Sequence, residues 1–188
     1  MDFNTLPEQW EWVALIIGIV TLILVTVSII RMAFGGPKVR IFFEKVDKEY
    51  GRYLVCQLNN EPIHKGILKY LMVRREVARN VTAGFEIIEQ RTNQVICPIM
   101  QVVIKTLANV ASFRVSLLAS FIPAEFAIAG YDRENKEVVI FKEPKQVLSV
   151  GAYKVKVEVL VGAKLLKDEC DFIVRDIYPF IHWEFIKP

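Results

Sequence analysis

Residues 153–161 read Tyr-Lys-Val-Lys-Val-Glu-Val-Leu-Val, and every second residue of this stretch is large and apolar. The alternating apolar residues are Tyr153, Val155, Val157, Val159 and Val161. Lysine and glutamate occupy most of the positions between them. Because successive side chains of a β-strand point to opposite faces, this alternation predicts a strand with one buried face and one solvent-facing side.

The apolar alternation returns after a short reversal, which predicts a β-hairpin. Gly162-Ala163-Lys164 supply the reversal, and apolar side chains recur at Cys170, Phe172 and Val174 on the way back. The two strands therefore share one buried face, which must pack against a second layer of the domain.

The sequence before this hairpin also reads as short strands separated by turns. We expect strands at residues 39–46, 53–58, 81–87, 95–104, 126–131 and 138–141. Within residues 81–87 the side chains of Val81, Ala83, Phe85 and Ile87 are expected to point inward. Turn-forming residues separate the strands, and residues 132–136 are a good hairpin turn.

Three features qualify this pattern. Pro98 predicts an edge or a break in its strand, because proline cannot donate a backbone hydrogen bond to a neighbour. Residues 63–73 favour a short helix or an irregular crossover, and residues 107–123 fit no single element. About eight or nine short strands with one minor helix nevertheless predict an all-β domain, built as an antiparallel β-sandwich.

The sequence Leu148-x-x-Gly151-x-Tyr153, followed by the alternating valines, resembles the tyrosine corner of immunoglobulin-like and fibronectin type III-like domains. The resemblance covers residues 147–174 and implies that the tyrosine hydroxyl bonds a backbone group across the corner. Many unrelated modules share this fold-level pattern, so the resemblance implies no function.

The cysteines depart from the pattern of true immunoglobulin domains. No cysteine lies on the valine-rich strand to pair with Cys56, so the inter-sheet disulfide is not expected. Cys56, Cys97 and Cys170 are widely spaced and form no CxxC or Cys/His cluster. We expect three buried or half-buried thiols and no metal site.

The N-terminal segment has the composition of a membrane span. Residues 13–30 carry no charge and no proline, and as a helix they extend about 27 Å, close to the ~30 Å of a hydrocarbon core. Trp10, Trp12 and Arg31 flank this run, and we expect them to lie at the membrane interfaces. A cleaved signal peptide fits less well, because the leader is acidic and the apolar run is too long.

These observations predict four regions along the chain. The expected regions are an extramembrane tail at 1–11, a transmembrane helix at 12–34, a linker at 35–38 and the β-sandwich domain at 39–188. Arg31, Lys38 and Arg40 follow the helix, whereas the tail before it carries no basic residue. The positive-inside rule then predicts an N-terminus outside the cell and a cytoplasmic β-domain.

No sequence motif indicates an enzyme. GxSxG, P-loop, GxGxxG and HExxH patterns are absent, and His64 and His182 are the only histidines. We expect no catalytic residue and no cofactor, and a formal net charge of +3 does not indicate a nucleic-acid binder.

The sequence favours a membrane-anchored, non-enzymatic interaction or scaffold module whose β-sandwich binds a protein partner on the cytoplasmic side. Two alternatives stay open. One is an extracytoplasmic binding or adhesion domain with inverted topology. The other is a small enzyme with a dispersed site, built on His64 or His182 beside a carboxylate.

Two surfaces are candidates for contacts. The densest basic run comprises Lys65, Lys69, Arg74, Arg75 and Arg79. This run either contacts anionic lipid headgroups or an acidic partner, or it is a solvent-exposed connecting segment whose lysines extend their charged ends into water. The C-terminal tail is rich in aromatic residues, namely Tyr178, Phe180, Trp183 and Phe185. This tail is either a closing strand or a segment that docks a partner or the membrane interface.

Overall fold

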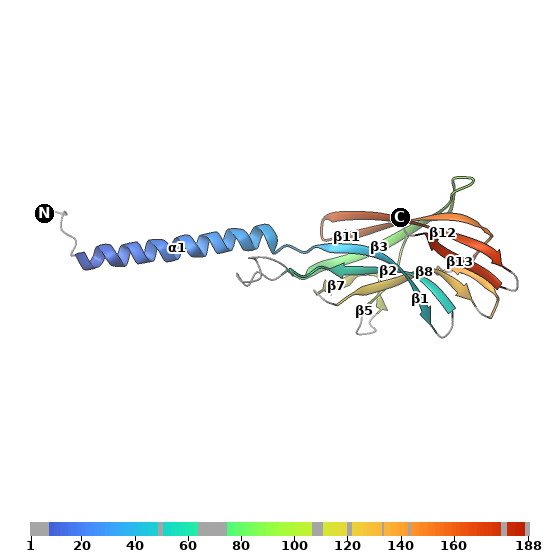
Figure 1. The fold of residues 1–188 in the computed structure, drawn as a ribbon, viewed down its shortest axis with the longest axis horizontal. Coiled ribbons are helices and arrows are strands. Elements are labelled where there is room, and N and C mark those ends of the chain that lie inside the picture. The colour runs from blue at the N-terminus through green and yellow to red at the C-terminus, as the bar shows by residue number, and fades with distance from the viewer. Residues whose placement is uncertain are drawn as a thin grey trace. The chain divides into compact units, whose positions relative to one another are not determined.

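The computed structural model of the chain describes residues 8–48, 51–63, 75–106, 111–119, 122–132, 134–142, 144–177 and 180–186. In these ranges one long helix precedes a series of antiparallel β-strands (Figure 1). The chain divides into two compact units. One unit comprises Met1–Gly36 and Pro62–Glu76, and the other comprises Pro37–Glu61 and Val77–Pro188. The predicted combination of an N-terminal apolar helix with an all-β domain is confirmed.

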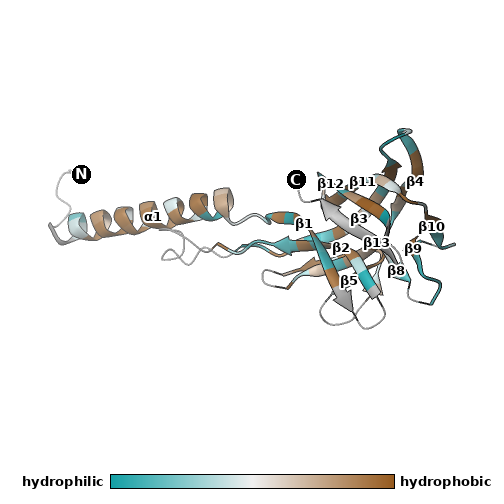
Figure 2. Ribbon diagram, turned by 45° about the vertical axis from the view of Figure 1, so that its right-hand side comes forward, coloured by the Kyte–Doolittle hydropathy of each residue, from teal (hydrophilic) through white to brown (hydrophobic). Residues whose placement is uncertain are grey.

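Helix α1, Glu8–Phe34, is apolar on all sides, as Figure 2 shows by its largely brown ribbon. Its segment Trp10–Phe34 is long and apolar enough to cross a membrane, and its most apolar stretch is not buried by any described residue. Two polar side chains in the span bond the helix itself. The hydroxyls of Thr21 and Thr26 each donate to the carbonyl oxygen four residues earlier, at 2.8 Å.

The β-domain contains two antiparallel sheets, drawn as two layers in Figure 1. The first sheet contains β1 (Val39–Lys48), β2 (Gly51–Asn60), β8 (Ala124–Asp132), β5 (Ile104–Thr106) and β6 (Ala111–Ser112) in that order, with β9 (Glu137–Ile140) on β8 and β10 (Gln146–Leu148) on β9. The second sheet contains β13 (Phe180–Ile186), β12 (Lys164–Ile177), β11 (Gly151–Val161), β3 (Ala78–Glu89) and β4 (Gln94–Gln101), with β7 (Val115–Leu118) on β3.

The inward faces of both sheets form one hydrophobic core. Val155, Val157 and Val159 of β11 have no exposed surface, so the predicted period-two burial is confirmed. The inward set expected on β3 is buried as well. Phe85 of β3 stacks on Phe126 of β8, with ring centroids 6.5 Å apart, and this contact joins the two sheets.

The outward face of β11 is polar, as the alternation predicts. Its ion pairs are Lys154–Glu169 at 3.0 Å, Lys156–Glu86 at 4.0 Å and Lys167–Glu158. These pairs connect β11 to its two neighbours, β12 and β3. Exposed ion pairs of this kind contribute little to stability, and their main effect is to keep this face soluble.

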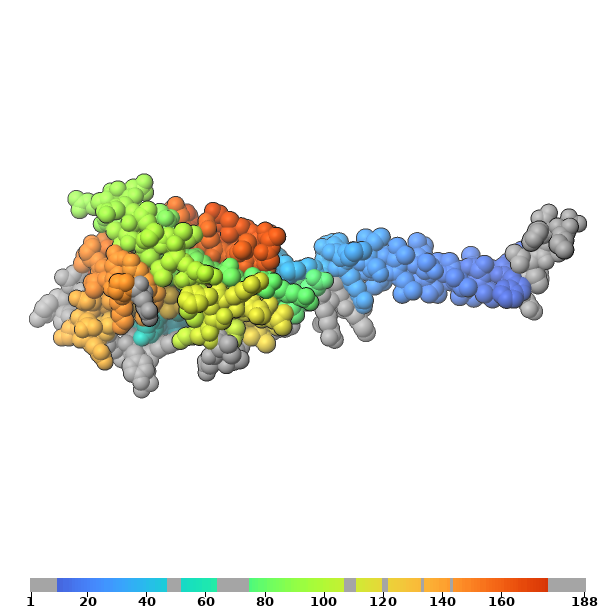
Figure 3. All heavy atoms as spheres, turned by 180° about the vertical axis from the view of Figure 1, so that it is seen from behind, coloured from blue at the N-terminus to red at the C-terminus, as the bar shows by residue number. Residues whose placement is uncertain are grey.

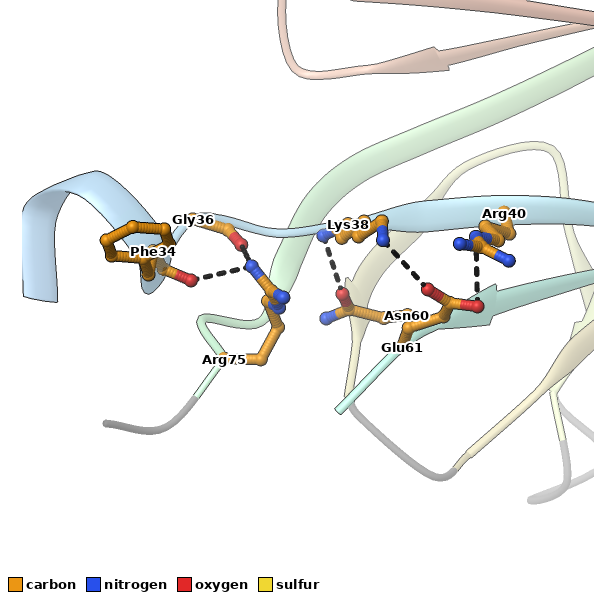
Figure 4. A network of polar contacts seen from close by, with 7 residues as sticks. All are labelled: Phe34, Gly36, Lys38, Arg40, Asn60, Glu61 and Arg75. Atoms are coloured by element: carbon orange, nitrogen blue, oxygen red, sulfur yellow. Dashed lines mark hydrogen bonds and ion pairs between the residues drawn. The ribbon is translucent and has the colours of Figure 1, made fainter. Parts of the chain in front are cut away.

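Asn60 is the buried polar residue of the described core, and it connects the two sheets. Its amide oxygen accepts from the backbone N–H of Lys38 at 3.0 Å, and its amide nitrogen donates to the carbonyl of Leu118 in β7 at 3.2 Å. Nearby, Glu61 pairs with Lys38 at 3.3 Å and with Arg40 at 2.9 Å (Figure 4). Both the oxygen and the nitrogen of the buried Asn60 amide are therefore hydrogen-bonded, and these bonds hold the start of β1 and the end of β2 in register.

Two expected elements differ from the structure. Residues 95–104 were predicted as one strand, but they form β4 and the start of β5, which belong to different sheets. The backbone N–H of Val102 donates to Ala83 at 3.0 Å before the chain leaves the second sheet. Residues 107–123 contain two short strands, β6 and β7. The short helix or crossover expected at 63–73 falls almost entirely outside the described residues.

Other local predictions are confirmed. β4 ends its sheet, so Pro98 does lie on an edge strand, and the pairing register of β3 with β4 shifts on both sides of Ile87. β8 and β9 form the hairpin expected around residues 132–136. β11 and β12 pair in continuous register from Gly151 to Val161.

The hydrogen bond implied by the tyrosine corner is present. The Tyr153 hydroxyl donates to the backbone carbonyl of Ser149 at 2.8 Å and lies 3.1 Å from the Ser149 hydroxyl. The Tyr153 ring is buried and stacks on Phe172 at 5.3 Å between centroids. The corner therefore fixes the entry of the chain into β11.

Replacing Tyr153 by Phe should lower the free energy of unfolding by about 1 kcal/mol, because the ring packing stays while the Ser149 carbonyl loses its donor. Tyr131→Phe is the matched control, since the Tyr131 hydroxyl makes no hydrogen bond within the described residues. Chemical denaturation of the detergent-solubilised chain, followed by circular dichroism, measures both variants. Equal destabilisation of the two would contradict the role of the corner.

Candidate functional site

The neighbours of β8 change along its length, and this change leaves a notch in the first sheet. On one side β8 pairs with β2 from Ala124 to Gly130. On the other side β5 pairs only with Ala124 and Glu125, and β9 pairs only from Ala129 onward. Between them, residues 126–128 have no partner strand on this side among the described residues, and one N–H of Phe141 donates to Ile128 at 2.9 Å.

An open groove of about 540 Å³ lies over this notch. Its apolar lining includes Val103 between β4 and β5, Phe113 between β6 and β7, Ala127 of β8 and Phe141 after β9. Figure 3 shows the yellow-green segment around residues 100–118 beside the orange segment around residues 137–150, and these segments supply most of the lining. Residues far apart in the sequence therefore meet at this groove.

Two apolar side chains of the lining are exposed to solvent. Phe113 is 56% exposed and Val103 is 39% exposed. Both belong to connections outside the strands, so the core does not use them. Exposed apolar surface inside a groove is typical of a binding site.

The charged part of the lining is basic. Lys105, Lys142 and Lys145 line the groove, and no aspartate or glutamate among the described residues does so. Lys145 lies 3.7 Å from Asp132, whereas no described carboxylate lies within ion-pair distance of Lys105 or Lys142. The described lining of the groove therefore combines an apolar floor with three lysines, of which Lys145 is paired with Asp132 and Lys105 lies opposite Glu125 in the strand register.

Asp132 is a fixed negative neighbour of this groove. Its pKa is lowered by a hydrogen bond from the Asn135 side chain, by the backbone N–H groups of Asn135 and Glu134, and by the charge of Lys145. The carboxylate is therefore ionised at neutral pH, and it orients the turn between β8 and β9.

The packing of Phe141, which lines the groove, depends on a glycine. Tyr53 and Phe141 lie with ring centroids 5.4 Å apart, and both rings approach Gly130. A Cβ atom at position 130 would lie 2.6 Å from Tyr53 and 2.9 Å from Phe141. Only glycine allows the rings to approach the strand this closely.

Gly130→Ala should therefore destabilise the domain by about 1–3 kcal/mol, since the new methyl group overpacks the contact with the two rings. Gly151→Ala is the control, because a Cβ at that position would meet no atom closer than 3.5 Å and should be nearly neutral. Thermal unfolding of both variants measures the difference. A Gly130→Ala protein as stable as the control would show that the two rings are free to move aside.

Of the basic residues predicted as one patch, the structure describes Arg75 and Arg79. Arg75 belongs to the unit of α1, where its guanidinium donates to the carbonyl oxygens of Phe34 at 2.6 Å and Gly36 at 3.0 Å (Figure 4). It thereby satisfies acceptors at the C-terminal end of the helix, where a cation is favoured. Arg79 is exposed in β3 of the β-domain. Lys65, Lys69 and Arg74 lie outside the described residues.

The aromatic tail forms the final strand, β13, which pairs with β12 at the edge of the second sheet. The backbone of Phe180, Trp183 and Phe185 belongs to this strand, whereas Tyr178 lies outside the described residues. At the other end of the chain, Trp10 and Trp12 are 60% and 67% exposed near the start of α1. Arg31 lies in the last turn of the helix.

The three cysteines are free and buried, as predicted. Burial raises the pKa of Cys56, Cys97 and Cys170, so these thiols stay protonated and are poor nucleophiles. Within the part of the chain that the structure describes, no group of three or more His, Cys, Asp or Glu side chains is arranged to hold a metal ion.

Sequence reasoning did not identify the groove. Lys105 lies far in the sequence from Lys142 and Lys145, and Val103 and Phe113 fall in the segments whose strand boundaries were wrong or ambiguous. The available signal was Phe113, an aromatic residue beside Arg114 in a segment of uncertain structure. No known protein family, curated protein or solved structure matches this chain.

Proposed function

We propose that this chain is a single-pass, membrane-anchored, non-enzymatic interaction module, in which α1 crosses the bilayer and the β-domain binds a protein partner on the cytoplasmic side. One observation carries the proposal: an apolar helix that is not buried among the described residues precedes a folded all-β domain with an exposed groove. The helix needs an apolar environment, and the groove offers a recognition surface.

The dimensions and chemistry of α1 support a membrane span. The 25 residues of Trp10–Phe34 extend about 37 Å as a helix, enough for the ~30 Å hydrocarbon core and part of both interfaces. Thr21 and Thr26 bond their own helix, so neither hydroxyl needs water. Trp10 and Trp12 precede the uncharged run, where an aromatic belt is favoured.

The charges beside the helix support the cytoplasmic location of the β-domain. Arg31, Lys38 and Arg40 follow the apolar run in the sequence. Arg75 adds a further cation to the same end of α1, because it binds the carbonyl oxygens of Phe34 and Gly36. Basic residues accumulate on the cytoplasmic side of membrane helices.

We also propose that the β-domain is an immunoglobulin-like sandwich. In that fold, strands A, B, E and D form one sheet, and C, F and G form the other. The order β1-β2-β8-β5 in one sheet and β3-β11-β12 in the other corresponds to this arrangement in chain order. The Tyr153 corner supports the same proposal. The domain departs from antibody domains because β11 has no cysteine to pair with Cys56.

Topology can be tested with single added cysteines in the full chain, Ala163→Cys in the exposed turn after β11 and Asn4→Cys in the N-terminal tail. The native thiols are buried and protonated, so they should add little background. In intact cells a membrane-impermeant maleimide should label Asn4→Cys and spare Ala163→Cys until the membrane is permeabilised. The reverse pattern would place the β-domain outside the cell and favour the extracytoplasmic alternative.

The interaction role can be tested by photo-cross-linking from exposed positions outside the groove. Leu117, Val150 and Leu165 are 63%, 58% and 49% exposed, and each can carry a photoreactive amino acid in the full chain. A protein-binding module should yield discrete protein adducts in its native membrane from at least one position. Lipid adducts alone at all three positions would contradict a protein partner.

A further inference from the structure

We propose that the groove beside β8 binds an acidic peptide segment of the partner protein, with one large apolar side chain of that segment inserted against Phe113 and Val103. This inference rests on the proposed interaction function and specifies its binding site. Three independent features of the groove support it: its strand notch, its exposed apolar floor and its lysines.

The notch favours an extended peptide as the occupant. Phe126 and Ala127 of β8 pair with β2, and Ile128 lies at a register shift in that pairing. On the other side no described strand pairs with these three residues, and the one bond is from the Phe141 N–H to Ile128. Backbone groups at such an interruption can pair with an extended chain, which is how many domains recognise peptides. A lipid chain has no amide groups to pair with this backbone.

The floor favours an apolar anchor. Phe113 is more than half exposed, and it shares the groove with Val103, Ala127 and Phe141. The volume of about 540 Å³ lies within the usual range of ligand sites, and it accommodates a large side chain together with neighbouring backbone. Aromatic and large aliphatic residues are the side chains that most often anchor an interface in such a groove.

The lysines favour acidic residues beside that anchor. Lys105 belongs to β5, whereas Lys142 and Lys145 belong to the connection between β9 and β10, so two segments far apart in the sequence supply the lysines. Lys105 and Lys142 have no carboxylate within ion-pair distance in the described chain, and Lys145 has one at 3.7 Å. Carboxylates of an incoming segment would complement all three charges.

The probe for this inference is a phage-displayed library of random dodecapeptides. The full chain is held in nanodiscs of phosphatidylcholine, and bound peptides are selected at physiological salt. Selected sequences should contain an aromatic or large aliphatic residue with at least two Asp or Glu residues close by. Enrichment of basic or uncharged sequences would overturn the inference.

The groove is then tested with a charge-reversal pair, Lys105→Glu combined with Lys142→Glu. Selected peptides should bind this variant at least about tenfold more weakly. The matched control combines Arg91→Glu with Lys164→Glu, which changes the net charge equally at exposed residues that do not line the groove. The control should retain affinity within about twofold, and circular dichroism should show that both variants are folded.

The apolar part is tested with Phe113→Ser. Because Phe113 is exposed, this change should leave the stability of the domain nearly unchanged. Peptide affinity should still fall about tenfold, which a purely electrostatic attraction to lysines would not predict. Unchanged affinity in this variant would overturn the insertion of an apolar anchor.

The remaining outcomes separate this inference from the proposed function. Suppose that protein adducts form from Leu117, Val150 or Leu165, but the groove variants bind the selected peptides as tightly as the unchanged chain. The groove would then not be the binding site, whereas the proposed interaction function would stand. If no peptide is selected and the groove variants lose binding to phosphatidylserine vesicles, the ligand of the groove is an anionic lipid and the peptide inference is overturned. If no protein adduct forms and no peptide is selected, both the interaction function and the peptide-binding groove are overturned.

Discussion

The pairing of β11 with both β3 and β12 is the constraint on which the β-domain depends. β11 is the one strand that aligns its buried valines against two long neighbours over nearly its full length. A slip of one residue on either side would turn Val155, Val157 and Val159 to solvent and Lys154 and Lys156 into the core. The Tyr153 corner prevents such a slip at the start of the strand, because the hydroxyl is bonded to Ser149. The second layer can then cover the buried face, and Phe85 and Phe126 stack across the interface.

The elements that could be predicted from the sequence are those whose side chains alternate strictly. The hairpin of β11 and β12, the buried face of β3 and the turn after β8 follow from local period-two patterns and turn residues. The apolar helix follows from composition alone. In each case the local sequence and the tertiary environment favour the same conformation, and such agreement is what makes an element predictable.

The groove could not be predicted because it arises where that local agreement ends. Residues 95–104 are apolar on both faces, so their sequence does not show that the chain leaves one sheet at Val102 and enters the other at Ile104. The notch beside β8 then results from the short length of β5 and from the end of β9 at Ile140, which are consequences of packing between distant segments. Arg75 is a similar case, since its position in a basic run does not reveal that its guanidinium binds the end of α1.

The buried thiols have a consequence for the conditions under which the fold persists. Cys56, Cys97 and Cys170 pack as small apolar side chains, and no cross-link holds the two sheets together. Stability therefore comes from the shared core and from the buried amide of Asn60, which are equally effective in reducing and oxidising surroundings. The domain can reach its native state without an oxidative step, so its folding rate is governed by the long-range strand pairing of the sheets. With its three thiols free and packed in the core, the fold of this domain is therefore compatible with a reducing compartment as well as with an oxidising one.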